Sequence, residues 1–226
     1  MFLVVTRNFP PDIGGIQSLM EGLSDGLTNH GPVKVFAYDF PGYESYDKKS
    51  NMDIERVKGI KLFRKYRKAN LVNQFLKENA NIRAIFTDHW KSLELLNDQY
   101  LKGTQTICLL HSKEINHEKG TSINKRIIKS TNKANFIIAN SNFTKKLAIK
   151  LGLDQSKINV IFPGIKKPKI LDTEVKEKSN NFFKDSFPKI ITVARLEKRK
   201  GHDKILMAVK NLKNKFEKIK YISVGS

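Results

Sequence analysis

Short runs of apolar residues alternate along the chain with longer segments in which apolar residues recur every three or four positions. An unbroken apolar run is typical of a strand buried on both faces of its sheet, and the longer spacing is typical of an amphipathic helix. The runs predict strands at residues 2–6, 33–38, 84–87, 106–110, 135–140 and 158–162. The longer segments predict helices at residues 16–29, 70–78, 92–100, 122–131 and 141–151. This alternation predicts an α/β fold with a doubly wound, Rossmann-like parallel sheet.

The end of the sequence begins a second pattern of the same kind. It predicts a strand at 190–196, a helix at 202–216 and a strand that starts at Tyr221, and the sequence ends at Ser226. One β-α-β unit is too small to close a core of its own. We therefore expect an N-terminal domain, an interdomain linker and the incomplete start of a second domain. Their predicted bounds are residues 1–165, 166–188 and 189–226.

Three features bear on the compartment. The single cysteine, Cys108, lies in an apolar run, which predicts a small buried side chain and excludes an intramolecular disulfide. Met1 to Val5 lack the basic start and the cleavage site of a secretory signal. No apolar run reaches the length of about 20 residues that a membrane-spanning helix needs. Together these features favour the cytoplasm.

The formal net charge is +20 at pH 7. It favours nucleotide phosphates, phospholipid headgroups or nucleic acid as partners, while a generally lysine-rich composition is the alternative explanation. Nucleic acid is not expected, because aromatic residues are not interleaved with the basic clusters as stacking platforms.

One basic cluster alternates with apolar residues over positions 56–68 and predicts contact with an anionic membrane surface. The alternative is a core strand at Ile60–Phe63 followed by a solvated turn. The basic members are Arg56, Lys58, Lys61, Arg64, Lys65, Arg67 and Lys68.

The segment from Asn8 to Gln17 joins the first predicted strand to the first helix. Ligands of open α/β sheets bind at the carboxyl ends of strands. Gly14 and Gly15 allow the backbone to approach a ligand, and the following helix directs free N–H groups at the same place. This arrangement predicts an anion site, with a simple turn as the alternative.

His111 directly follows an apolar strand, so we expect it at the same edge of the sheet. A histidine there is suited to hydrogen bonding or proton transfer, and a structural role is the alternative. No pair of histidines has the spacing of metal ligands, so no zinc site is expected. Ser141 is expected to cap the helix that Gly152 ends.

A strand delivers Arg195 to a basic loop, and Lys200 lies in that loop just before a helix. Two cations and a helix N-terminus suit a diphosphate, since arginine forms forked hydrogen bonds and lysine acts as a point charge. A solvated basic loop is the alternative.

Five segments together resemble the retaining GT-B glycosyltransferases of family 4. They are Phe9–Gln17, His111–Glu114, Ala139–Thr144, Ile161–Gly164 and Ala194–His202. They occur in the family's order and span almost the whole chain. The Phe-Pro-Pro form of the first segment is similar to the phosphatidylinositol-mannoside mannosyltransferase branch, which uses GDP-mannose.

The resemblance implies two Rossmann-like domains that face a cleft, and transfer of a hexose from a nucleotide diphosphate sugar to an alcohol with retention of configuration. It implies no metal or other cofactor, and leaves GDP and UDP open. The acceptor is lipid-linked or a saccharide, and a peripheral position on the inner face of the membrane is one expected location.

The resemblance also implies residue roles. His111 is expected beside the transferred sugar. Arg195 and Lys200, with Gly14 and Gly15, are expected near the donor phosphates. The residues expected on the acceptor side are Asp12, Gln17 and Lys113.

The sequence departs from the family after Ser226, where nothing supplies the glutamate pair that holds the donor sugar. The resemblance therefore covers the acceptor half and the diphosphate-binding loop, and implies a shortened or split enzyme. The alternative is a non-catalytic anion- or partner-binding half that needs a complementing C-terminal chain.

Overall fold

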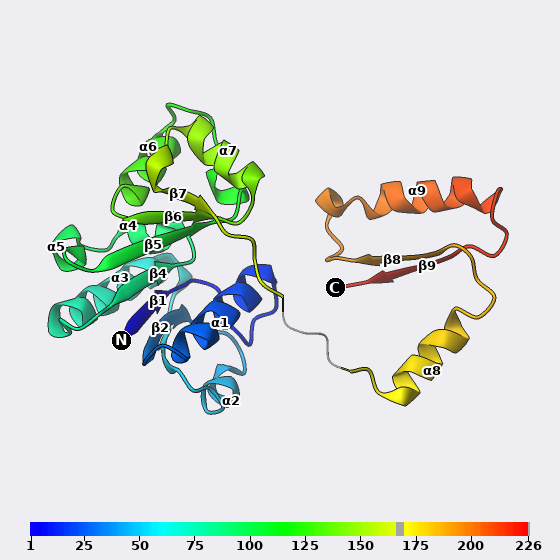
Figure 1. Cartoon of the computed structure of the whole chain (residues 1–226), viewed down its shortest axis with the longest axis horizontal. Helices are drawn as coiled ribbons and strands as arrows, with labels where there is room; N and C mark the ends of the chain where they lie inside the picture. The colour runs from blue at the N-terminus through cyan, green and yellow to red at the C-terminus, as the bar shows by residue number, and fades with distance from the viewer. Residues whose placement is uncertain (166–169, 226) are drawn as a thin grey trace. The chain divides into compact units, whose positions relative to one another are not determined.

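The computed structural model describes residues 1–165 and 170–225. The chain folds into two compact units, Met1–Lys166 and Lys167–Ser226. The first unit runs from blue to yellow-green in Figure 1, and the second from yellow to red.

The first unit contains a parallel sheet of seven strands in the order β3-β2-β1-β4-β5-β6-β7. The strands are β1 (Phe2–Val5), β2 (Val33–Tyr38), β3 (Asp53–Val57), β4 (Ala84–Thr87), β5 (Gln105–Leu110), β6 (Phe136–Ala139) and β7 (Ile158–Val160). The strand order reverses at the β1–β4 pair, where Val4 lies between Val35 and Phe86. In a sheet of this kind, the crevice for ligands opens at the carboxyl ends of the strands beside this pair.

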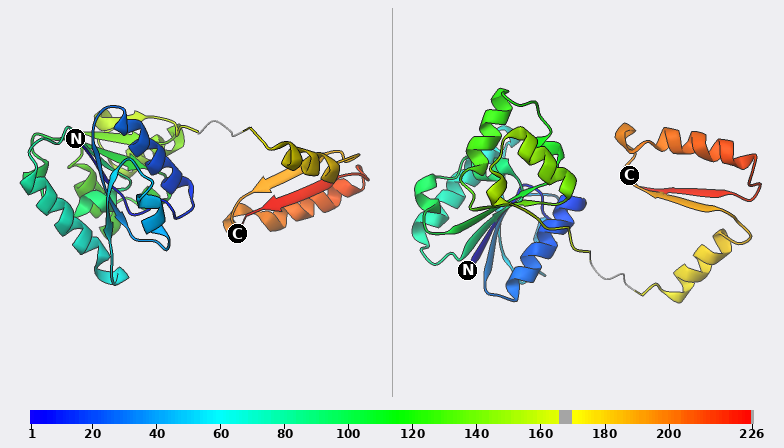
Figure 2. Two further views of the ribbon diagram at one scale, coloured as in Figure 1. Left: turned by 90° about the horizontal axis from the view of Figure 1, so that it is seen from below. Right: turned by 45° about the horizontal axis from the view of Figure 1, so that its top comes forward.

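Helices cover both faces of the sheet. They are α1 (Gly15–Thr28), α2 (Tyr43–Asp47), α3 (Lys61–Glu78), α4 (Trp90–Glu94), α5 (Asp98–Leu101), α6 (Ser122–Thr131) and α7 (Asn142–Leu151), with 3₁₀ turns η1 (Lys113–Ile115) and η2 (Gln155–Lys157). Alternate residues of β1 face opposite cores: Val4 packs with Met20 of α1, and Leu3 packs with Val72 of α3. Figure 2 shows α1 and α3 on opposite sides of the strands. The predicted doubly wound α/β fold is confirmed.

The alternative interpretation of the basic cluster, a core strand at Ile60–Phe63, is wrong, because Ile60 directly precedes α3 and the helix begins at Lys61. The third strand instead lies at Asp53–Val57, a segment with no unbroken apolar run. This strand is at the edge of the sheet and pairs only with β2, so alternating polar residues are tolerated there.

The predicted helix at 92–100 is divided into α4 and α5. The break falls at Asn97, whose side chain accepts a hydrogen bond from the backbone N–H of Gln99 and starts the second helix. The expected caps of α7 are confirmed. Ser141 accepts from the N–H of Thr144, and Gly152 ends the helix with a left-handed φ of 99°. Cys108 is buried as expected.

The second unit contains α8 (Thr173–Phe182), β8 (Lys189–Val193), η3 (Lys198–Lys200), α9 (His202–Lys213) and β9 (Lys220–Val224). Strands β8 and β9 are parallel. Helix α8 lies within the segment predicted as a linker, and the Asp172 side chain caps it by accepting from the N–H of Glu174. Among residues 170–225, no side chain is buried. Across the described part of the chain, no helix combines the length and apolar character needed to cross a bilayer.

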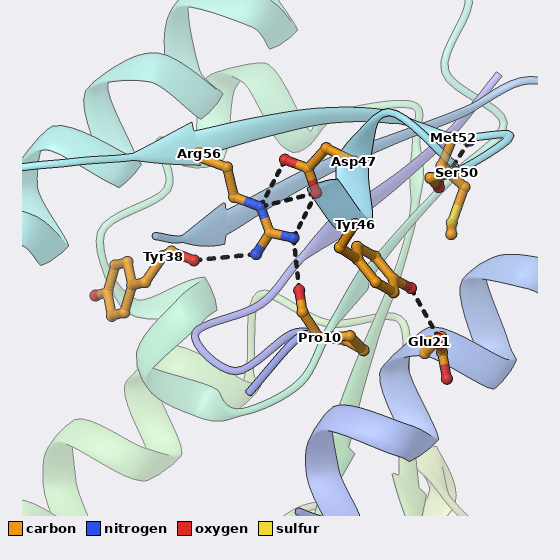
Figure 3. Close-up of polar contacts among 8 residues, drawn as sticks. All are labelled: Pro10, Glu21, Tyr38, Tyr46, Asp47, Ser50, Met52 and Arg56. Atoms are coloured by element: carbon orange, nitrogen blue, oxygen red, sulfur yellow. Dashed lines mark hydrogen bonds and ion pairs between the residues drawn. The ribbon is translucent and has the colours of Figure 1, made fainter. Parts of the chain in front are cut away.

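A buried ion pair fixes the loop that follows β1. The Arg56 side chain is only 3% exposed and lies 2.7 Å from Asp47 of α2. Its guanidinium also donates to the carbonyl oxygens of Tyr38, at 3.2 Å, and Pro10, at 2.6 Å (Figure 3). Nearby, the Tyr46 hydroxyl donates to Glu21 of α1. Arg56 therefore joins β3, α2 and the end of β2 to the loop, and it does not form part of a membrane-contacting surface.

Replacing Asp47 by Ala is expected to lower the free energy of unfolding by about 3 kcal/mol, because it leaves the Arg56 charge buried without its partner. The measurement is urea unfolding followed by the fluorescence of Trp90, the only tryptophan and a buried residue. Asp53→Ala is the control. Its ion pair with Lys34 is formed by a carboxylate that is 69% exposed, so the loss should stay below about 1 kcal/mol. Equal losses in the two variants would contradict a special role for the buried pair.

Candidate functional site

The carboxyl ends of β1, β4 and β5 bring three loops of the first unit together. Strand β4 pairs with β1 on one side and with β5 on the other. The loop after β1 leads through residues 6–14 to α1, Asp88 follows β4, and His111 follows β5. The first motif and His111 therefore lie at the same edge of the sheet.

Asp88 links the three loops and is only 1% exposed. Its carboxylate accepts hydrogen bonds from the backbone N–H of Arg7, at 3.0 Å, and from the Ser92 hydroxyl, at 2.7 Å. Its own backbone carbonyl lies 2.9 Å from Nε2 of His111. One residue thus ties the β1 loop, helix α4 and the candidate histidine.

Lys68 reaches this cluster from α3 and is also buried. Its ammonium group donates to the carbonyl oxygen of Thr6, at 3.0 Å, and to the Ser92 hydroxyl, at 2.9 Å. The expectation that Lys68 contacts a membrane is therefore wrong. The signal that could have found it is its position one helical turn before Val72 and two before Leu76, on the buried face of α3.

Burial shifts the pKa values of Lys68 and Asp88. Burial lowers the pKa of Lys68 to about 8, and the nearby Asp88 carboxylate offsets only part of that effect. Burial by itself raises the pKa of Asp88, but the charges of Lys68 and Arg7, together with the hydrogen bonds from Arg7 and Ser92, outweigh it and hold that pKa below its ordinary value. Asp88 is therefore a stable anion, and Lys68 is a cation that is easily deprotonated.

The hydrogen bond to Asp88 determines which ring nitrogen of His111 is available. A carbonyl oxygen can only accept, so Nε2 of His111 carries the proton and donates. In the neutral ring, Nδ1 is then an acceptor, and the described residues supply it with no partner. The neighbouring His89 is different, because burial lowers its pKa to about 3. Its Nδ1 accepts from the N–H of Lys91 at the start of α4, which makes it a structural residue.

The turn after His111 is held in an unusual conformation. Ser112 has a φ of 81°, which is uncommon for a residue with a side chain. Its hydroxyl shares a hydrogen bond with that of Thr144 in α7, and Thr144 donates to Asn140 at 2.6 Å. The backbone N–H of His111 donates to the Glu114 carboxylate. Strained backbone that is held by several partners is typical of functional sites. Lys113, expected on the acceptor side, is exposed on this turn.

The first motif presents two glycines with different surroundings. A Cβ at Gly14 would lie 2.5 Å from the Gln17 side chain, whereas a Cβ at Gly15 would meet no atom within 4 Å. The Gln17 amide donates to the Asp12 carboxylate, so these two expected acceptor-side residues are in contact. Gly14 thus allows Gln17 to fold back, and the backbone at Gly15 is open.

In the second unit, Arg195 and Lys200 lie in one loop, as the sequence predicts. Both are exposed, and Arg195 is paired with Glu197 at 3.2 Å. His202, at the end of the last segment that carries the family resemblance, organises the loop. Its Nε2 lies 3.0 Å from the Arg195 carbonyl, and its Nδ1 lies 3.3 Å from the Ser223 hydroxyl. Its position at the start of a predicted helix, directly after the basic loop, was the available signal.

The expected site residues therefore fall into two groups. Gly14, Gly15 and His111 belong to the first unit, and Arg195 and Lys200 belong to the second. Within the described ranges, no group of three or more histidine, cysteine or acidic side chains could hold a metal ion.

The fold and the polar loops at its carboxyl edge define a Rossmann-like α/β protein whose candidate site lies beside the switch point of its sheet. The family model for Glycosyltransferase Family 4 matches residues 13–167, and the chain belongs to this family. No curated protein sequence matches the chain.

Solved structures agree on the fold. HepE of Anabaena, crystallised with UDP-glucose, has a TM-score of 0.65 at 12% identity, over 100% of this chain and 70% of HepE. A glycosyltransferase of Rickettsia africae has a TM-score of 0.66 at 17% identity, over 100% of this chain and 69% of the Rickettsia protein. The lipopolysaccharide outer core galactosyltransferase WaaB has a TM-score of 0.63 at 12% identity, over the same shares. At these identities the likeness concerns the fold, and it confirms the expected GT-B type of Rossmann-like fold.

The lowered pKa of Lys68 predicts a pH-dependent stability. The folded state releases this proton near pH 8, whereas the unfolded state keeps it up to the ordinary lysine value of 10.5. The unfolded state binds more protons between these values, so stability rises with pH in that window. From pH 8 to 10, the unfolding free energy of the wild type relative to Lys68→Met should increase by about 2 kcal/mol. Burial also raises the pKa of Cys108, to about 12. Because both proteins contain Cys108, its contribution cancels in this comparison. A flat difference would show that Lys68 titrates normally.

Proposed function

We propose that the protein transfers a hexose from a nucleoside diphosphate sugar to an alcohol acceptor, with retention of configuration. Membership of Glycosyltransferase Family 4 supports the reaction class. The observation that carries the proposal within the site is the fixed His111 ring, whose Nε2 is engaged by Asp88 while Nδ1 remains available. A sugar hydroxyl that donates to Nδ1 would be held at the carboxyl edge of the sheet, where ligands of this fold bind.

For the donor, we propose a uridine or guanosine diphosphate sugar. HepE, a structural neighbour, binds UDP and UDP-glucose, which supports UDP-glucose as the first donor to test. The form of the first motif favours GDP-mannose as the second. Arg195 and Lys200 would bind the diphosphate and stabilise the negative charge that develops as the bond to the sugar breaks.

The remaining roles are those that the family resemblance implies for residues at the edge of the sheet. The open backbone at Gly15, with Gly14, suits a close approach to phosphate or acceptor. Asp12, Gln17 and Lys113 would bind the acceptor, either a saccharide or a lipid-linked alcohol. The proposed reaction uses no resident metal or other cofactor.

A second candidate is a non-catalytic anion- or partner-binding role, with transfer only after a complementing C-terminal chain is added. The observation that favours it is the lack of buried side chains in residues 170–225. Helices and strands without buried side chains are weakly stabilised. A diphosphate site in residues 170–225 would therefore become more rigid if a complementing chain packed against them.

The test combines nucleotide binding with sugar transfer. UDP and GDP are titrated while the melting temperature is recorded, and release of nucleotide from UDP-glucose and GDP-mannose is followed with alcohol acceptors. The double variant R195A/K200A should bind nucleotide at least about 10-fold more weakly, because each cation contributes a charge-assisted contact. Lys210→Ala, which removes an exposed cation elsewhere on α9, is the control. His111→Ala should lower turnover by about 100-fold and leave nucleotide affinity unchanged.

Failure of both nucleotides to stabilise the protein would overturn the proposal. Nucleotide binding without turnover, restored by a complementing chain, would favour the second candidate.

A further inference from the structure

The beginning of α3 carries a surface in which large apolar side chains lie among cations. Ile60 is 70% exposed, Leu62 72%, Phe63 53% and Tyr66 49%. We call this region the α3 surface. Its members are Ile60, Leu62, Phe63 and Tyr66 together with Lys58, Lys61, Arg64, Lys65 and Arg67. A contiguous set of exposed apolar side chains rimmed by polar ones marks an interaction site.

No residue in the first two turns of α3 is buried. The buried residues of the helix are Lys68, Ala69, Val72 and Leu76, so burial begins only after residue 67. Figure 2 shows the cyan start of α3 at the periphery of the first unit. The core therefore does not account for the apolar character of residues 60–66.

The turn that leads into the helix is held in place. Arg64 donates to the Gly59 carbonyl, at 3.2 Å, and Arg67 donates to the Ile60 carbonyl, at 3.0 Å. Gly59 has a φ of 95°, which suits glycine. The apolar side chains of the α3 surface are thus presented by an ordered backbone.

The α3 surface has an excess of positive charge. Two carboxylates lie near its edge. The first, Asp39, pairs with Arg64 at 3.1 Å. The second, Glu44, lies near Lys58. The pKa of Lys58 is raised mainly by its hydrogen bond to Tyr43, and less by the charges of Glu44 and Asp39. In the described part of the chain, Lys61 and Lys65 form no ion pair. The five cations therefore exceed the nearby acidic groups, and the surface is complementary to an anionic partner.

We propose that the α3 surface docks the protein on an anionic lipid bilayer. Apolar side chains would enter the boundary between headgroups and acyl chains, while the lysines meet lipid phosphates and bury their stems. A second copy of the chain is a poor occupant, because a two-fold contact would bring the same positive charges together. The inference goes beyond the proposed transferase function and does not depend on it.

The position of the α3 surface in the fold determines how the first unit would be oriented on a bilayer. The crossover from β3 to β4 must start at the carboxyl edge of the sheet, so α3 begins there. His111 and the loop after β1 lie at the same edge. A docked bilayer would therefore lie on the side of the first unit where its candidate site opens. The buried Arg56 and Lys68 take no part.

The test is flotation of the full chain with vesicles of phosphatidylcholine alone, or with phosphatidylglycerol added. The wild type should float with the anionic vesicles and remain unbound with the neutral ones. The charge reversal K58E/K61E/K65E should lower the partition coefficient at least about 100-fold, since each lysine near an anionic surface contributes a factor of about 5. The matched control K119E/K125E/K146E changes the net charge equally at exposed positions elsewhere, and it should reduce binding less than about 10-fold.

A second pair of measurements tests the apolar part. Leu62→Ser with Phe63→Ser should abolish the binding that survives at high salt, and Phe63→Trp should shift its fluorescence to the blue when anionic vesicles are added, above the constant signal of buried Trp90. Equal losses in the two charge-reversed variants, or no binding to anionic vesicles, would overturn the proposal. So would a concentration-dependent dimer that the serine variant dissociates, because a second copy would then be the occupant.

Discussion

The carboxyl edge of the first unit depends on a single buried carboxylate. Asp88 accepts a backbone N–H from the β1 loop and a hydroxyl from α4, and its carbonyl engages His111. An unpaired charge at 1% exposure would cost several kcal/mol. Lys68 offsets that cost from α3, and it also donates to the carbonyl oxygen of Thr6, directly after β1. The geometry of the candidate site is therefore maintained by the same interactions that make the charge tolerable.

Local patterns predicted most of the sheet, because its central strands are buried on both faces and appear as unbroken apolar runs. Strand β3 was missed because it lies at the edge, where one neighbour is enough and Asp53 and Glu55 are tolerated. The beginning of α3 was also missed, since its apolar residues serve no core and do not follow the helical period of the buried face. The hydrophobic pattern reports which residues are buried, so it does not predict the parts of helices and strands that lie outside the core.

The candidate site was predicted in part for a similar reason. His111 was found because a polar residue directly after an apolar strand lies at the carboxyl edge, and the same rule would have identified Asp88 after β4. Lys68 and Asp88 meet at the Ser92 hydroxyl, and they are far apart in the sequence, so no local spacing reveals their interaction. The basic cluster looked uniform in the sequence, yet two of its members are buried and the rest surround exposed apolar side chains. Only the three-dimensional structure separates these roles.

The buried guanidinium of Arg56 has a consequence for the composition of the chain. All three of its nitrogens donate, in different directions, to the Asp47 carboxylate and to the carbonyl oxygens of Tyr38 and Pro10. A lysine would keep the charge, but its single ammonium nitrogen cannot span acceptors that a planar fork reaches separately. Even in a chain this rich in basic residues, position 56 requires an arginine. The shape of a side chain, and not its charge, limits which cation can hold the β1 loop.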